Sequence, residues 1–141
     1  MRFPSKEQVE RVRKQYPTGV RVELISMSDP YTKLKPGDRG TVNHVDDTAT
    51  IFVSWDNGSG LGVIYAEDSV RLLSKAEIIK EQCRKVVATG RTNMFDTKVA
   101  FEIALELGFD ELADFMFMNT KAYSALILTG ELSDSDIIEW P

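Results

Sequence analysis

The hydrophobic pattern of this 141-residue chain changes twice, from helical to strand-like and back to helical. Near the N-terminus, Val9, Val12 and Tyr16 recur at spacings of three and four residues, which predicts a helix with one apolar face. Ser5 stands three residues before Gln8, the capping-box spacing at which each side chain satisfies the backbone N–H of the other residue. We therefore expect a helix to begin just after Ser5 and to end near Tyr16.

After this helix the hydrophobic period shortens to two, the alternation that is typical of half-buried strands. Turn sequences such as Asp56-Asn57-Gly58 separate the apolar runs. Strands of this length and spacing leave no room for crossover helices, so the sheet should be antiparallel and should curl on itself into a small barrel. Five strands are expected, at residues 20–24, 40–45, 50–55, 61–65 and 69–73.

The remainder of the chain returns to helical spacing. Ser74 and Glu77 repeat the capping-box arrangement at the start of an expected helix. Asp96 and Asp110 each precede an apolar stripe and are expected to cap two further helices, and a fourth is expected over residues 120–130. The predicted fold class is therefore α+β. An N-terminal helix and a small antiparallel β-barrel should occupy residues 1–73, and an acidic region of three to four helices should occupy residues 74–141.

Charge is unevenly distributed within the net value of −5. Residues 1–19 and residues 74–91 each carry a net charge of +3, whereas residues 92–141 hold two lysines against ten acidic residues. Because affinity for nucleic acid comes from Lys and Arg that neutralise phosphates, the negative total disfavours a strong phosphate-backbone binder. The acidic last third instead suits a basic partner, or simply keeps the protein in solution.

The residues that would perform catalysis or bind a metal ion are scarce. His44 and Cys83 are the only residues of their kinds, too few for the common Cys/His zinc sites, and no nucleophile motif surrounds either. We expect an outward-facing strand position for His44 and a semi-buried structural thiol for Cys83. Residues 58–62 are rich in glycine but lack the Lys-Ser/Thr of a phosphate-binding loop. No catalytic site, cofactor site or metal site is expected, and the protein is not expected to be an enzyme.

One cysteine cannot form an internal disulfide, and a lone thiol suits a reducing compartment. The chain contains no run of 18 apolar residues, and its start is too polar for a signal peptide. A cytoplasmic location with no membrane partner is the expectation.

Aromatic side chains near turns and strand ends are candidates for gripping a peptide or a nucleotide. For Trp55 a place in the barrel core is favoured over a contact with a partner, whereas Tyr31, in a long loop, suits either role equally. Arg91 lies between two expected helices and serves either to cap a helix or to bind. The candidate partner-binding residues are Tyr31, Trp55, Asp56, Asn57, Tyr65, Arg91, Asp110, Glu111 and Asp114.

Two short motifs in the strand region follow one another in an order found in known small barrels. The run Gly40-Thr41-Val42, followed by Val53-Ser54-Trp55-Asp56-Asn57-Gly58 and then Tyr65, resembles small SH3-like barrels in which a GTV strand precedes a V-x-W-D-N-G hairpin. The resemblance implies that the expected barrel is SH3-like.

Longer stretches are similar to two uncharacterised domain families of phages and mobile elements, the first of them found in gut Firmicutes. Residues 3–73 resemble the first family through Phe3-Pro4-Ser5-Lys6, Arg21-Val22-Glu23-Leu24, Asp29-Pro30-Tyr31 and Trp55-Asp56-Asn57-Gly58. Residues 88–131 resemble the second through Gly90-Arg91-Thr92-Asn93-Met94-Phe95-Asp96 and Leu128-Thr129-Gly130-Glu131. Neither family carries a known chemistry, so the resemblance implies a setting, the accessory gene of a mobile element in a bacterial cytoplasm.

This setting, together with the acidic last third, suggests a host protein as the partner. Small acidic inhibitors of defence nucleases, including anti-CRISPR proteins, imitate the charge of nucleic acid and occupy a basic channel. The expected partner is therefore a CRISPR effector or another nucleic-acid-binding enzyme, inhibited by protein–protein contact. The acidic residues that motivate this hypothesis include Asp110, Glu111, Asp114, Asp134, Asp136 and Glu139.

Two other hypotheses remain. The SH3-like barrel and the two basic segments, residues 1–19 and 74–91, suit a nucleic-acid-binding accessory factor. An adaptor in conjugation or virion assembly is the third hypothesis, and assembly into a homo-oligomer stays open.

Overall fold

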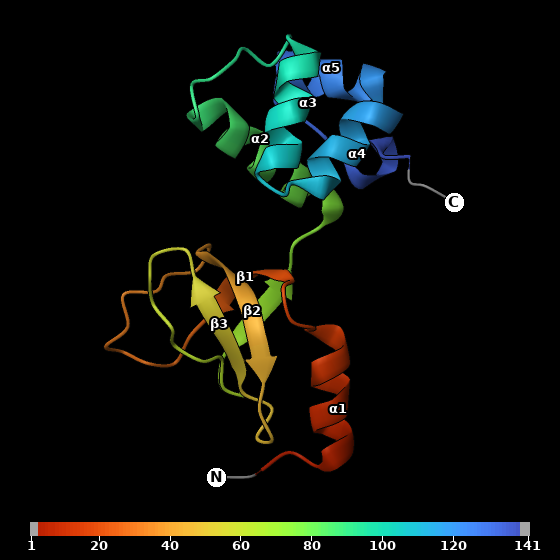
Figure 1. The fold of residues 1–141 in the computed structure, drawn as a ribbon. Helices are drawn as coiled ribbons and strands as arrows, with labels where there is room; N and C mark the ends of the chain where they lie inside the picture. The colour runs from red at the N-terminus through yellow and green to blue at the C-terminus, as the bar shows by residue number, and fades with distance from the viewer. Residues whose placement is uncertain (1–2, 139–141) are drawn as a thin grey trace. The chain divides into compact units, whose positions relative to one another are not determined.

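The computed structural model describes residues 3–138 of the chain. The chain is divided between Leu73 and Ser74 into two compact units. The first unit contains a helix and an antiparallel sheet of four strands, and the second contains four α-helices and a short 3-10 helix (Figure 1). The α+β class predicted from the sequence is therefore confirmed.

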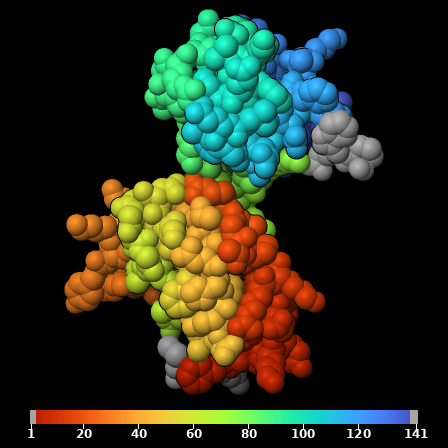
Figure 2. Space-filling model, in the orientation of Figure 1, coloured from red at the N-terminus to blue at the C-terminus, as the bar shows by residue number. Residues whose placement is uncertain are grey.

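Helix α1 (Lys6–Gln15) begins with the predicted capping box. The Gln8 backbone N–H donates to Ser5 Oγ at 3.2 Å, and the Ser5 backbone N–H donates to Gln8 Oε1 at 2.7 Å. Val9 and Val12 are buried in the core of the first unit. Arg13 Nε donates to the carbonyl of Val45 at 3.1 Å, which ties the helix to the end of the second strand, and Figure 2 shows the two side by side.

The sheet has the strand order β3-β2-β1-β4, and all neighbouring strands are antiparallel. Successive residues point to opposite faces of the sheet, as the sequence period of two predicts. In β1, Val22 and Leu24 are buried, while Arg21 and Glu23 point to the other face. The strands are β1 (Arg21–Ser26), β2 (Arg39–Val45), β3 (Ile51–Trp55) and β4 (Ser69–Leu72).

The sheet has four strands rather than the expected five and is not closed, so it is only loosely barrel-like, because residues 61–65 do not become a strand. Only Val63 bridges to Ile51, through backbone hydrogen bonds of 2.8 and 3.0 Å. The next N–H, that of Ile64, donates instead to Asp68 Oδ2 at 2.8 Å, and Ala66 turns the chain with φ at 65°. This side-chain-bound turn competes with the ladder, and the sheet remains open.

The second unit contains the predicted four helices, and the first of them starts with the predicted capping box of Ser74 and Glu77. Asp96 caps the second helix by accepting from the backbone N–H of Val99. Asp110 was expected to cap the third helix, but it is the first residue of that helix, and the capping position belongs to Phe109. The helices are α2 (Lys75–Ala88), α3 (Thr97–Glu106), α4 (Asp110–Met118), α5 (Thr120–Thr129) and the 3-10 helix η1 (Asp134–Asp136).

Two buried polar side chains hold the core of the second unit together. The Tyr123 hydroxyl donates to the carbonyl of Met94, in the segment before α3, and the Tyr123 side chain is 2% exposed. The Asn119 amide forms two hydrogen bonds with the backbone of Ile138, at 2.8 and 3.0 Å, and so fixes the segment after η1. Within residues 3–138, no helix is long and apolar enough to cross a membrane.

Candidate protein-binding groove

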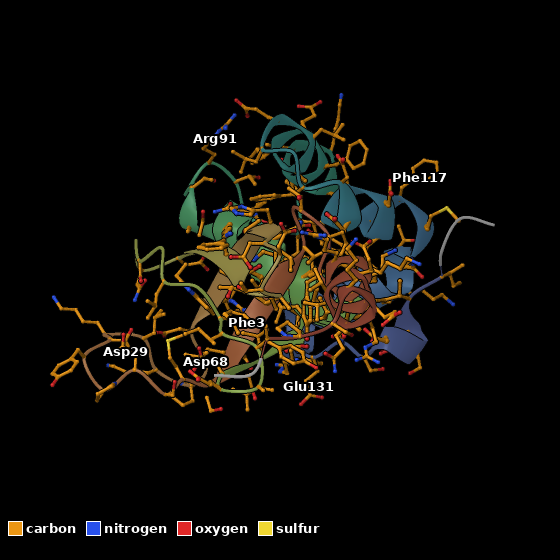
Figure 3. The ribbon with its side chains drawn as sticks, turned by 90° about the horizontal axis from the view of Figure 1, so that it is seen from below. Phe3, Asp29, Asp68, Arg91, Phe117 and Glu131 are labelled. Carbon is orange, nitrogen blue, oxygen red and sulfur yellow. The ribbon has the colours of Figure 1, made fainter. Side chains whose placement is uncertain are left out.

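Two adjoining cavities form a hollow in the described part of the first unit. Their volumes are about 320 and 260 Å³, and they share Ile64, Tyr65 and Ala66. We call the combined hollow the edge groove. Phe3 lines the larger cavity and Asp68 lines the smaller one, and both are labelled in Figure 3. The remaining lining comes from Pro4, α1, residues 48–51 and the rest of residues 63–70.

The edge groove runs beside an unpaired edge of the sheet. The carbonyl of Arg21 in β1 accepts from the N–H of Leu73 at 3.1 Å. Since hydrogen-bonded and non-hydrogen-bonded pairs alternate between antiparallel strands, Glu23 and Arg71 form the next hydrogen-bonded pair. The backbone groups of Val70 and Leu72 therefore point away from β1. Among residues 3–138 their N–H groups have no hydrogen-bond partner, which leaves them available to another strand.

Strained backbone lines the same groove. Ala49 and Ala66, with φ at 59° and 65°, are the two described residues other than glycine with a positive φ, and both line the smaller cavity. An alanine in this conformation costs about 1–2 kcal/mol. Hydrogen bonds hold the turns in place, since Asp46 Oδ1 accepts from the N–H groups of Thr48 and Thr50. Such strain tends to cluster at sites of function, where the surrounding structure enforces it.

The walls of the groove are aromatic and its rim is acidic. Tyr16 and Tyr65 are both half-buried. Burial raises the pKa of the Tyr16 hydroxyl, which donates to the outward carbonyl of Val70 at 3.4 Å. Glu67 and Asp68 line the groove, whereas none of its described lining residues is a lysine or an arginine. An apolar segment with basic flanks is the chemistry that complements this surface.

The structure separates the three aromatic candidates. Tyr65, a candidate partner-binding residue, lines both cavities of the edge groove. Trp55 is 3% exposed, and its Nε1 donates to the carbonyl of Leu61 at 2.8 Å, so it is a core residue and offers no surface to a partner. Tyr31 is 92% exposed and lies in the loop between β1 and β2, outside the groove.

Asp56 and Asn57 have local roles at the β3 turn. Both carboxylate oxygens of Asp56 accept from the guanidinium of Arg21, at 2.6 and 2.8 Å. Asn57 Oδ1 accepts from the N–H of Ser59 at 2.9 Å, which closes the turn.

The candidate residues of the second unit do not form a single cluster of side-chain contacts. Arg91 forms an ion pair of 2.6 Å with Glu106, and Glu111 accepts from Gln82 Nε2 at 2.9 Å. Asp110 and Asp114 are exposed, one turn apart on α4. Asp134 accepts from the N–H of Ala76 and Asp136 from that of Ser133, and Glu139 lies outside the described residues.

His44 and Cys83 adopt the positions expected for structural residues. His44 is exposed on β2, and its ring stacks on that of Phe52 with the centroids 4.7 Å apart. Cys83 is buried in α2, and burial raises the pKa of its thiol, which keeps it protonated. In the described range 3–138, no group of three His, Cys, Asp or Glu side chains is arranged to hold a metal ion.

Sequence reasoning missed the groove because its chief features have no local signature. Ala49 and Ala66 are ordinary residues in the sequence, and only the backbone shows their conformation. A usable signal was the position of Asp46 and Asp68 beside turns, since aspartate side chains at turns commonly accept hydrogen bonds from nearby backbone N–H groups.

Comparison with known proteins adds family matches that follow the division between the units. Residues 5–73 match a domain of unknown function (DUF4314), and residues 75–131 match a second domain of unknown function (DUF5049). No curated protein matches the chain. The protein therefore carries two adjacent domains of unknown function, one in each compact unit.

Proposed function

We propose that the protein is a non-catalytic binding protein and that its edge groove holds an extended segment of a partner protein. The supporting observation is that the smaller cavity is lined by Ser69 and Val70 of β4, where the N–H of Val70 points away from β1. Peptides that add a strand to an open sheet edge gain affinity from the main chain and specificity from pockets for alternate side chains. The acidic rim favours Lys or Arg beside the apolar residues of the partner.

A peptide-display selection against the full chain tests this proposal. Enriched peptides should combine alternating apolar residues with Lys or Arg, and Tyr65→Ala should weaken their binding about tenfold or more. Tyr31→Ala is the matched control, because Tyr31 is an exposed tyrosine of the same unit outside the groove. Ile64→Lys is a second variant, since Ile64 is 38% exposed and its replacement should leave the fold intact. Equal binding by Tyr65→Ala, Ile64→Lys and the native chain would refute the groove as the binding site.

We also propose, as a second candidate, inhibition of a nucleic-acid-processing enzyme such as a CRISPR effector in the cytoplasm of a phage host. The observation that favours it is the set of exposed carboxylates on consecutive helices, Glu102 of α3 with Asp110 and Asp114 of α4. An acidic surface of this kind competes with nucleic acid for a basic channel.

A pull-down from the bacterial host tests the inhibitor hypothesis. It should recover a nucleic-acid-binding enzyme that is released by high salt or by competing DNA, and Asp110→Asn with Asp114→Asn should weaken the complex. Salt-independent capture, or recovery of no such enzyme, contradicts it.

Direct nucleic-acid binding is less favoured, because Arg21, Arg39 and Arg71 on the sheet each contact a carboxylate. A gel shift of nucleic acid at micromolar protein and low salt would favour direct nucleic-acid binding over inhibition of an enzyme.

A further inference from the structure

We propose that the second unit contains a separate site for an apolar ligand that carries a carboxylate. The site is a cavity of about 280 Å³ between α3, α4 and α5. Its apolar surface comes from Phe101, Met116, Phe117 and the ring of Tyr123. Small-ligand sites are typically apolar hollows with a few polar groups that orient the ligand, and this cavity lies at the lower end of their size range.

The exposed ring of Phe117 is the unusual part of this surface. Phe117 is 67% exposed, and Figure 3 shows its side chain projecting from α4. Phe101 and Met116 continue the apolar surface into the unit, where they contact its core. A ligand that covers the Phe117 ring removes apolar area from water, which favours binding.

Four polar side chains around the cavity have no hydrogen-bond or ion-pair partner among residues 3–138. The ammonium group of Lys98 forms no ion pair or hydrogen bond within residues 3–138, although the unit is rich in carboxylates. The hydroxyls of Thr97, Thr120 and Ser124, which also line the cavity, likewise have no hydrogen-bond partner in that range. The Tyr123 hydroxyl is already bonded to Met94, so Tyr123 contributes its ring alone.

One cation and three hydroxyls beside an apolar floor complement a carboxylate attached to an apolar body. None of the described residues that line the cavity is acidic, so a cationic ligand finds no counter-charge among them. The same chemistry occurs in a free aromatic acid and in the C-terminal residue of an apolar peptide. The test must therefore include both sources.

Chemical-shift titrations of the full chain, uniformly labelled with ¹⁵N, distinguish these sources. The probes are 3-phenylpropanoate and an acetylated tetrapeptide that ends in phenylalanine, each compared with its amide. Saturable shifts at Lys98, Thr120 and Ser124 with a carboxylate, and binding at least about tenfold weaker with its amide, support the proposal. The probe that binds more tightly identifies the source.

Variants distinguish binding in the cavity from non-specific attraction of the probe to positive charge. Lys98→Ala and Phe117→Ala should each weaken the better probe about tenfold. Lys121→Ala is the matched control, because Lys121 is an exposed lysine of the same unit that does not line the cavity. The proposal is overturned if neither carboxylate binds at up to about 10 mM, if the amides bind equally well, or if Lys98→Ala and Lys121→Ala behave alike.

Discussion

The side chain of Gln82, in the middle of α2, accepts a hydrogen bond from the backbone N–H of Leu112 in the first turn of α4, at 3.0 Å. Its amide nitrogen donates to Glu111 Oε2 at 2.9 Å. The capping residue of α4 itself, Phe109, has no side-chain oxygen to offer. A residue 30 positions earlier in the chain therefore caps this helix and sets its position against α2.

Replacement of Gln82 by alanine should lower the stability of the second unit by about 1–2 kcal/mol, because the Leu112 N–H loses its partner. Hydrogen exchange at the Leu112 amide measures this directly. Arg84→Ala, at an exposed position of the same helix, is the control and should change stability by less than about 0.5 kcal/mol. Equal protection of Leu112 in the two variants would show that the cap contributes nothing.

Glu23 should be the most sensitive charged residue of the sheet. Its two carboxylate oxygens accept separately from Arg39, at 3.1 Å, and from Arg71, at 2.8 Å, and its side chain is 20% exposed. Glu23→Gln should destabilise the first unit by about 1–3 kcal/mol in denaturant unfolding, because two guanidinium groups lose a charged acceptor that is largely shielded from water.

The control for Glu23 is Asp47→Asn, which also breaks an ion pair with an arginine, that of Arg13 at 2.7 Å. The Asp47 side chain is 98% exposed, so water replaces the lost contact and the change should be below about 1 kcal/mol. Similar losses for both variants would contradict the importance assigned to burial.

Gly40 should tolerate no side chain. A Cβ atom there would lie 2.5 Å from Val53 Cγ1 and 2.9 Å from the carbonyl oxygen of Ser54, so β2 and β3 would have to separate. Gly40→Ala should cost about 3 kcal/mol or more, read as a lower denaturation midpoint. Gly60→Ala has open space around its Cβ and should be neutral or slightly stabilising. A mild effect at Gly40 would show that the strand pair is more adaptable than its geometry indicates.

Stability of the second unit should fall at alkaline pH because of Tyr123. Burial raises the pKa of this hydroxyl to about 12 from its ordinary 10.0, and the neighbouring Cys83 adds to the shift. Between pH 10 and 12 the unfolded chain releases this proton while the folded chain retains it, so the free energy of unfolding decreases as pH rises. The loss across that window should be of order 2 kcal/mol.

The pH dependence of Tyr123→Phe isolates the effect of this hydroxyl. Both proteins contain Cys83 and the same other tyrosines, so the difference between their pH profiles belongs to Tyr123. The variant should be less stable at neutral pH by about 1 kcal/mol, because the carbonyl of Met94 loses its donor, but it should lack the steep alkaline decline. Parallel profiles would mean that Tyr123 ionises normally in the folded protein.

The parts of the fold that depend on near neighbours were predictable. The capping boxes at Ser5 and Ser74 each join residues three positions apart, and both form as predicted. Strands β1 and β2 were also predictable, because the residues that face the core recur at every second position over much of each strand. A single sequence contains such signals in full, since both partners lie within one helical turn or one strand.

Prediction failed where a side chain takes a backbone N–H that the predicted element would have used. The segment 61–65 has the composition of a strand, but Asp68, four residues further along the chain, accepts from the N–H of Ile64 and the chain turns away. Asp110 looks like a helix cap, but Gln82 approaches the first turn of α4 from another helix. The first outcome is a local competition between a turn and a strand, whereas the second depends on a tertiary contact that overrides local propensity.

The amino-acid sequence alone determined the order and type of most elements, the α+β class and the acidity of the last third, because propensity, periodicity and composition are properties of short segments. The tertiary structure decided that the sheet stays open, that Trp55 is buried while Tyr65 faces a groove, and that Lys98 stands beside an apolar cavity without a counter-charge from residues 3–138. These features depend on which side chains come into contact in the folded chain, and the free energy of such contacts depends on several positions at once.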